Sequence, residues 1–161
     1  MSVEFTFVAM SQSDATQVAG WRYEPPYSFY DWTADADDLA LLLDEKTRTG
    51  RFFSAYDERG TLVGFFEFQV EAEDAVVGLG LHPSLTGRGL GRAFVESGLA
   101  FARLKFRPVR FRLSVAGFNR RAIRVYETCG FAPNRTYEHA TNGGVHEFLE
   151  MTRAADPQPN R

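Results

Sequence analysis

Cysteine and long apolar runs are both scarce in this chain. It has a single cysteine, Cys129, among 161 residues, so no disulfide can form within it, as is typical of proteins from a reducing compartment. Its apolar runs are far shorter than the roughly 20 residues of a membrane-spanning helix, and its first residues lack the basic start and apolar length of a secretion signal. We therefore expect a cytoplasmic protein with no membrane partner.

Acidic residues are nearly absent from one segment. Residues 86–125 hold ten Lys or Arg and a single acid, Glu96, although the whole chain carries a formal charge of −3. Such a charge block favours binding of an anion, unless it is simply a solvated basic face. Because the segment has no recognition motif and the chain as a whole is acidic, we expect no nucleic-acid partner.

Apolar residues are abundant enough for one folded domain. The chain is 44% hydrophobic and 14% aromatic, values typical of a globular protein. Alternating and helical spacings of these residues predict an α/β (α+β) fold, with a mixed sheet and helices on its faces. The predicted strands cover residues 3–10, 51–71 (a hairpin that turns at Asp57–Gly60), 75–83, 109–115, 131–140 and 145–151, and the predicted helices cover residues 35–50, 89–107 and 119–129.

The stretch HPSLTGRGLG places three glycines, Gly87, Gly89 and Gly91, just before a predicted helix. It matches neither the dinucleotide fingerprint, which needs glycine where Arg92 stands, nor a Walker loop. Glycines nevertheless let a ligand approach the backbone, and the N–H groups that open a helix bind anions. This helix and the one after Asn119 both begin with arginines instead of the usual acids, so a bound phosphate is the predicted counter-charge.

Two motifs resemble the GNAT superfamily of acyl-CoA-dependent N-acetyltransferases. LGLHPSLTGRGLG resembles the family's pyrophosphate loop, Q/R-x-x-G-x-G/A after a strand, with Thr86 where the family has Gln or Arg. NRRAIRVYETCGF, residues 119–131, is similar to the family's N-x-x-A-x-x-x-Y-x-x-x-G-F. The resemblance implies a single domain over residues 1–153, with a mostly antiparallel sheet, a splayed pair of strands and helices on both faces. We expect the proline-containing tail, residues 154–161, to be disordered.

The resemblance also implies a site for acetyl-CoA, with CoA as product, and no metal. The splayed strand would offer backbone groups to the pantetheine arm, the loop backbone would hold the pyrophosphate, and Asn119 would contact the arm. Tyr126 would protonate the departing thiolate as a general acid, unless it is only a core residue. The implied cofactor-binding residues are Leu79, Gly80, Leu81, Thr86, Gly87, Arg88, Gly89, Leu90, Gly91, Arg92, Asn119 and Tyr126.

The general base is open at the level of sequence. In the predicted strand LVGFFEFQVE, Glu67 shares a face with Phe65 and Gln69. Glu67 is either the catalytic base, accepting a proton through water, or a solvated strand residue.

The stretch WRYEPPYSFYDW holds six aromatic residues in twelve positions. By the resemblance it lies over the acceptor cleft, where Tyr27, Tyr30 and Trp32 would bind the substrate amine; alternatively, these rings form a lid packed on the core. The predicted function is direct transfer of acetyl from acetyl-CoA to a primary amine of a small molecule, peptide or protein, within a ternary complex. The alternative is a catalytically silent CoA-binding sensor. A homodimer is one possible assembly.

Overall fold

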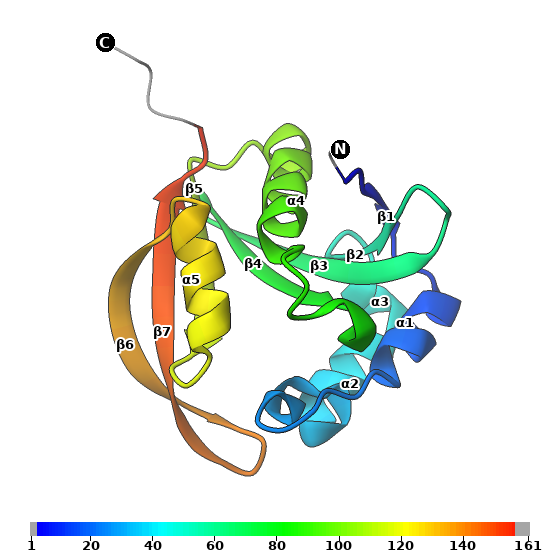
Figure 1. The fold of residues 1–161 in the computed structure, drawn as a ribbon, viewed down its shortest axis with the longest axis horizontal. Helices are drawn as coiled ribbons and strands as arrows, with labels where there is room; N and C mark the ends of the chain where they lie inside the picture. The colour runs from blue at the N-terminus through cyan, green and yellow to red at the C-terminus, as the bar shows by residue number, and fades with distance from the viewer. Residues whose placement is uncertain (1–2, 157–161) are drawn as a thin grey trace.

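A seven-stranded sheet runs through the computed structural model, which describes residues 3–156 (Figure 1). The strand order is β1-β2-β3-β4-β5-β7-β6, and only β4 and β5 pair in parallel. This arrangement confirms the predicted α/β (α+β) fold with a mixed, mostly antiparallel sheet. The strands are β1 (Thr6–Ala9), β2 (Phe52–Tyr56), β3 (Leu62–Glu71), β4 (Asp74–Leu81), β5 (Arg110–Ala116), β6 (Ala132–Thr141) and β7 (Gly144–Ala154).

Helices cover both faces of this sheet, as predicted. They are α1 (Gln12–Ala19), α2 (Ala36–Leu43), α3 (Glu45–Arg48), α4 (Gly91–Phe106) and α5 (Arg120–Thr128), with short 3-10 turns η1 (Tyr27–Tyr30), η2 (Trp32–Ala34) and η3 (Pro83–Leu85). Within residues 3–156, no helix is both long and apolar enough to span a membrane.

The alternation of side chains along β3 creates two separate cores. Phe66 and Phe68 face α4 and α5 in the larger apolar cluster. Phe65 points to the opposite face and joins Phe52 in a smaller cluster with α1 and α2. Because consecutive strand residues point to opposite faces, one strand anchors both helical layers.

The divergence of β4 from β5 opens the molecule at its centre. The two strands pair only at residues 74–76 with residues 110–112, although β4 continues to Leu81 and β5 to Ala116. In Figure 1 the half of the sheet formed by β1 to β4 spreads away from the half formed by β5, β7 and β6. This confirms the predicted splayed pair of strands.

The structure differs from the sequence prediction at two places in the helices. The single helix expected over residues 35–50 is two helices, because Asp44 interrupts it. The Asp44 carboxylate accepts hydrogen bonds from the backbone N–H (3.3 Å) and the hydroxyl (2.7 Å) of Thr47, which starts a new helix. Helix α1 was not predicted; it is short and begins at the side-chain cap of Ser11.

The predicted start of the disordered tail, residue 154, lies too early in the sequence. Strand β7 extends to Ala154, and Ala155 is fully buried. The Ala155 N–H donates to the Val109 carbonyl (2.9 Å), and its own carbonyl accepts from Arg103 Nε (2.9 Å). These contacts order residues 154–156, while residues 157–161 lie outside the described residues.

Candidate functional site

Two cavities adjoin where β4 leaves β5. The first, about 430 Å³ and here called the loop cavity, lies between β4, residues 85–92 and the first turns of α5. The second, about 470 Å³ and here called the aromatic cavity, lies between β3, β4, residues 29–38 and the β6–β7 hairpin. Tyr23, Tyr30 and Leu79 line both cavities, so the two meet at these residues.

The glycine loop has the backbone that its sequence predicts. Gly87 (φ +73°) and Gly89 (φ +78°) are both left-handed, a conformation that side chains disfavour. A Cβ at Gly91 would lie 3.2 Å from Val125 Cγ2, so this glycine lets the start of α4 pack closely on α5. Thr86, which departs from the family pattern, donates its hydroxyl to the Pro83 carbonyl (3.0 Å) and closes the preceding turn.

Helix α4 begins without a side-chain cap. Its hydrogen bonding starts with the Phe94 N–H, which donates to the Leu90 carbonyl (3.0 Å), so the N–H groups of residues 91–93 have no helical acceptor. Its first turn contains no acid. The other α-helices are all capped, by Ser11, Asp35, Asp44 and Asn119. The start of α4 therefore offers free donors and a positive dipole end beside the loop cavity, a combination that suits an anion.

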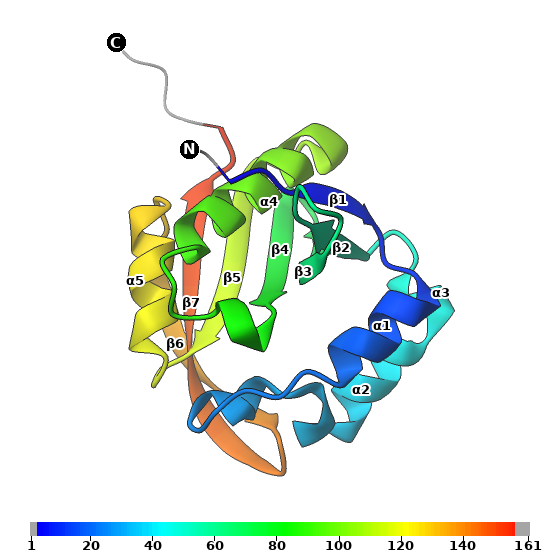
Figure 2. The ribbon, with the colours of Figure 1, turned by 45° about the vertical axis from the view of Figure 1, so that its right-hand side comes forward.

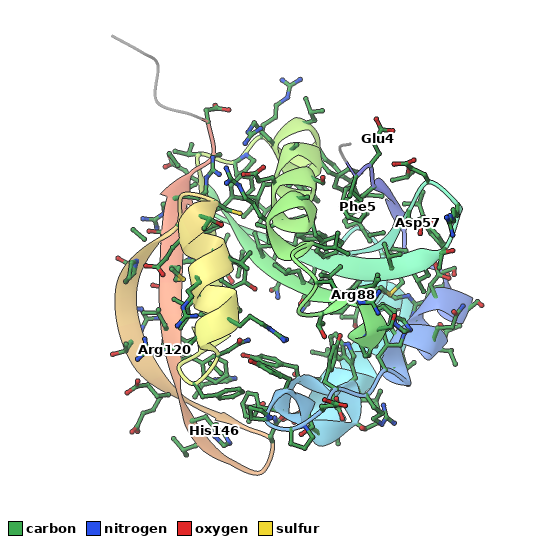
Figure 3. The ribbon with its side chains drawn as sticks, in the orientation of Figure 1. Glu4, Phe5, Asp57, Arg88, Arg120 and His146 are labelled. Atoms are coloured by element: carbon green, nitrogen blue, oxygen red, sulfur yellow. The ribbon has the colours of Figure 1, made fainter. Side chains whose placement is uncertain are left out.

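Arg121 supplies a cation to the loop cavity. Its guanidinium centre lies 4.0 Å from the centre of the Tyr27 ring, and its Nη1 would lie 3.4 Å from a Cβ at Gly87. Figure 3 shows Arg88 on the loop before α4 and Arg120 at the start of α5. The arginines at the start of α5 were expected from sequence to favour a phosphate, but Arg121 was not among the predicted cofactor-binding residues.

Other cations of the basic segment are neutralised within the sheet. Arg110 pairs with Asp74 (2.8 Å), and Arg112 pairs with Glu71 (2.6 Å) and Glu150 (3.4 Å). The basic segment, residues 86–125, is therefore neither wholly an anion-binding surface nor wholly a solvated basic face.

The backbone of β4 faces the gap at Leu79. The His82 N–H donates toward β3, to the Val63 carbonyl (2.8 Å), whereas the Leu81 carbonyl accepts from the Tyr23 hydroxyl (2.6 Å) on the other side. Because backbone groups of alternate residues point in opposite directions across a strand, the N–H and carbonyl of Leu79 turn toward the diverging side. They are available where the two cavities meet.

Nine of the twelve predicted cofactor residues line the loop cavity. They are Leu79, Leu81, Thr86, Gly87, Gly89, Gly91, Arg92, Asn119 and Tyr126. Gly80 does not line it, because Gly80 pairs with Phe65 of β3 and a Cβ there would lie 2.5 Å from the Phe65 ring. Arg88 and Leu90 belong to the same loop but lie outside the lining. The binding role of all these residues stays a prediction.

Both polar atoms of the Asn119 side chain form hydrogen bonds within the protein. Its Oδ1 accepts from the Ala122 N–H (3.1 Å) and caps α5, and its Nδ2 donates to the Tyr30 hydroxyl oxygen (3.1 Å). That oxygen also accepts from the Ala116 N–H (3.3 Å). Because both partners of Tyr30 are donors, the hydroxyl's own hydrogen is left to point into the junction of the cavities.

Tyr126 lines the loop cavity with an uncommitted hydroxyl. Its ring packs edge-on against Phe131, and no residue in the described range 3–156 hydrogen-bonds its hydroxyl. Burial raises the pKa of Tyr126 above its ordinary value, with a smaller contribution from nearby Tyr30, so the hydroxyl stays protonated. Burial also raises the pKa of the Cys129 thiol, as expected for a packed thiol and not for a nucleophile.

Tyr30, Trp32 and Glu67 line the aromatic cavity and Tyr27 does not; their binding and catalytic roles stay predictions. Tyr27 lies in the loop cavity beneath Arg121, because η1 turns it toward α5. Glu67 Oε2 pairs with Arg51 Nε and accepts from Gln69 Nε2 (3.2 Å).

Further residues that were not among the predicted site residues line the aromatic cavity. Asp31 and Asp38 contribute carboxylates to the aromatic cavity, and the β6–β7 hairpin contributes Tyr137, His139 and Phe148. Both acids belong to the stretch DWTADADDL, whose carboxylates are expected from sequence either to attract a cationic acceptor or to serve the start of a helix, whereas nothing in the sequence places the distant hairpin at this site.

Comparisons with known proteins agree with the fold and the loop. The sequence model of the acetyltransferase (GNAT) family matches residues 11–131. A mycothiol acetyltransferase from Propionibacterium freudenreichii is 39% identical over 83 residues, which are 48% of this chain and 26% of that relative. One from Thermobispora bispora is 39% identical over 108 residues, which are 62% of this chain and 36% of that relative. This chain thus spans only a minor part of the length of these curated relatives.

Solved structures show the same fold at low identity. The spermidine N-acetyltransferase from Vibrio cholerae in complex with CoA and spermine aligns with a TM-score of 0.75 and 20% identity, over 94% of this chain and 95% of that one. A chimeric form of that enzyme aligns with a TM-score of 0.78 and 22% identity, over the same shares of the two chains. Since the family model covers well over half of the sequence, the chain belongs to the acetyltransferase (GNAT) family.

Proposed function

We propose that the chain is an N-acetyltransferase that moves an acetyl group from acetyl-CoA directly to a primary amine. The observation that carries this proposal is the uncapped start of α4 beside the left-handed glycines, opening into a cavity that meets a second cavity at Leu79 and Tyr30. Family membership and the acetyl-transfer activity named for the relatives support it.

The loop cavity fits the cofactor. Main-chain donors of residues 87–93 and the Arg121 guanidinium would hold the pyrophosphate, because a dianion requires donors and positive charge without competing acids. No Asp or Glu of the described residues lines this cavity. The free backbone groups of Leu79 would align the pantetheine arm and the acyl carbonyl.

Transfer needs a neutral amine, an acid and a proton acceptor. Acetyl-CoA supplies the acetyl thioester when bound. The amine nitrogen forms a C–N bond to the acetyl carbon as the C–S bond breaks, Tyr126 donates its proton to the departing sulfur, and the amine gives up one proton. Tyr126 regains its proton from solvent, so the products are the N-acetylated amine and CoA.

Glu67 is the proposed acceptor of the amine proton, through water. Its Oε2 is held by Arg51 and Gln69. Its Oε1 faces Gly78 of β4, where a Cβ would lie 3.2 Å away. A side chain at position 78 would thus crowd this oxygen, and because Glu67 lines the aromatic cavity, water in that cavity would relay the proton to it. We also place the activity in the cytoplasm, since a sequence with one cysteine has no internal disulfide, as is usual for proteins of a reducing compartment.

Thiol release from acetyl-CoA in the presence of an amine panel tests the proposal. We expect turnover with at least one primary amine. Binding of acetyl-CoA without turnover on any amine would instead support the silent sensor.

A further inference from the structure

The two cavities carry opposite charge. The charged side chains that line the aromatic cavity are Asp31, Asp38 and Glu67, together with the titratable His139; no Lys or Arg of residues 3–156 lines it. The loop cavity is lined by Arg121 and by Arg92, which pairs with Glu96 (3.1 Å), and by no acid of residues 3–156. The protein thus presents one surface for an anion and another for a cation, joined at Leu79.

Asp38 is the acid of this cavity that lacks a partner. Glu67 pairs with Arg51, and Asp31 accepts from the Tyr23 N–H (2.9 Å). The Asp38 carboxylate accepts no hydrogen bond from any residue in the range 3–156. Asp38 is itself exposed to solvent; its partial burial, followed by the nearby carboxylates of Asp35 and Glu67, raises its pKa, and a cation beside it would offset this repulsion.

Aromatic rings surround the same space. Tyr30 and Trp32 line the cavity from one side, and Tyr137 and Phe148 line it from the hairpin. Ring faces attract ammonium groups, most strongly where water is excluded. The rings and the acid therefore favour the same chemical class of ligand.

Hydrogen bonds fasten the hairpin across the cavity. Asp35 Oδ2 accepts from the Asn142 N–H (3.0 Å) and from the Thr141 hydroxyl (3.1 Å), and Asn142 Nδ2 donates to the Phe29 carbonyl (2.7 Å). Figure 2 shows the tip of the β6–β7 hairpin beside the segment that holds η1. Figure 3 labels His146 on this hairpin. The centre of the His146 ring is 4.9 Å from the centre of the Phe29 ring. These contacts hold the hairpin against residues 29–35 beside the cavity.

We propose that the acceptor is a small diamine, with its reacting nitrogen at the junction near Leu79 and Tyr126 and a second, protonated nitrogen held by Asp38 and the surrounding rings. This inference rests on the proposed function. The reacting nitrogen must be neutral when it attacks, so it cannot supply the positive charge that Asp38 lacks. A second amino group stays protonated throughout the transfer and takes no part in the reaction, so it can supply that charge.

Thiol release with matched amines tests this substrate class. The probes are 1,4-diaminobutane, n-butylamine, which has the same carbon chain and a single nitrogen, and a tetrapeptide with a free α-amine. We expect kcat/KM for the diamine to exceed that for both others by about tenfold or more. Equal or faster turnover of butylamine or the peptide overturns the inference and leaves the proposed function standing. Turnover of no amine overturns the proposed function itself, and the inference falls with it.

A pair of variants separates recognition from general damage. Asp38→Asn should raise KM for 1,4-diaminobutane about tenfold, with kcat and the butylamine values little changed, because the ion pair is equally present in ground and transition states. Asp37→Asn removes the same charge from the same helical turn, but Asp37 does not line the cavity; it should change neither parameter. Identical kinetics for the two variants would overturn the assignment of Asp38.

Discussion

At the scale of single residues, the candidate site depends on two side chains whose polar atoms make no hydrogen bond to any of residues 3–156, although the Arg121 guanidinium lies over the Tyr27 ring. The Tyr126 hydroxyl and the Arg121 guanidinium both border the loop cavity. Polar groups near a protein's interior are normally paired. Transfer from an anionic cofactor requires two such donors, a neutral hydroxyl that can give up a proton and a cation that can hold the phosphates.

Replacing Tyr126 by Phe tests the acid. We expect Tyr126→Phe to lower kcat about a hundredfold with little change in KM for acetyl-CoA, since a hydroxyl that acts only on the leaving sulfur contributes to the transition state alone. Steady-state thiol release measures both constants. Tyr56→Phe, which removes a hydroxyl that lines neither cavity, is the control and should leave kcat near the wild-type value.

The pH dependence of kcat follows from the same residue. Burial raises the pKa of Tyr126 above its ordinary value of 10.0, so the proton needed for transfer is retained at all lower pH values. We expect kcat to show no alkaline decline between about pH 7 and pH 10. A descending limb centred near pH 8, absent from Tyr126→Phe, would contradict the sign of this shift.

Arg121 and Arg124 form a matched pair on α5. Arg121 lines the loop cavity and Arg124, one turn later, does not. We expect Arg121→Gln to weaken CoA binding about tenfold through loss of a charge-assisted contact, and Arg124→Gln to have little effect. Calorimetric titration with CoA measures both. Equal weakening by the two variants would mean that only the general field of the helix matters.

At the scale of elements, α4 is fixed on the sheet by a glycine. A Cβ at Gly98 would lie 2.1 Å from Phe66 Cζ, so the helix and β3 touch at this point. The closeness of this contact helps to set where the start of α4 lies relative to β4.

Gly98→Ala should therefore destabilise the protein, although alanine ordinarily stabilises a helix relative to glycine by about 1 kcal/mol. We expect a loss of about 2–3 kcal/mol in the free energy of unfolding, because the buried Phe66 ring must shift. Urea denaturation measures it. Ser97→Ala, at the half-buried neighbouring position, should be neutral or slightly stabilising. A stabilised Gly98→Ala variant would refute the close contact.

Most elements could be predicted from sequence because their periodicity is local. Alternation in residues 109–115 and the capping residue Asn119 led directly to β5 and α5. The break at Asp44 could not be predicted from periodicity, because a side chain that competes for backbone N–H groups ends one helix and starts another. Helix α1 has only eight residues, too few for a clear apolar repeat.

At the scale of the whole molecule, the two cavities differ in how far sequence reveals them. The loop cavity is built mainly from two continuous motifs, around Gly89 and Tyr126, so its donors could be named in advance. The aromatic cavity combines β3, β4, residues 29–38 and a hairpin about one hundred residues later. Which residues line this cavity depends on the order of strands in the sheet and on the contact of Asp35 with Asn142. No local sequence pattern encodes either of these.

A charge network across the sheet links β4, β5, β6 and β7, and it makes stability depend on acid. Glu150 is buried and accepts from Asn134 Nδ2 (2.7 Å), Arg135 Nε (3.1 Å) and Arg112 Nη1 (3.4 Å). Burial acts to raise the pKa of Glu150, but these contacts outweigh it and hold the pKa below its ordinary 4.5. A lowered folded-state pKa stabilises the fold above the unfolded value, and this stabilisation is lost as pH falls through the folded value.

We therefore expect the urea midpoint to be nearly constant from about pH 8 to pH 5 and to fall below about pH 4.5. Glu150→Gln should weaken this acid dependence, since an amide has no charge to lose, although it costs stability at neutral pH. Denaturation curves at a series of pH values decide the matter. Parallel losses in the wild type and Glu150→Gln would assign the acid sensitivity elsewhere.

The measurement that tests the central claim most directly is calorimetric titration of the protein with CoA and, separately, with pantetheine, which lacks the pyrophosphate. If the glycine loop and the start of α4 hold the diphosphate, CoA should bind with clear heat, and pantetheine should bind about a hundredfold more weakly or not at all. Equal affinity for the two compounds, or no heat with CoA, would contradict the account.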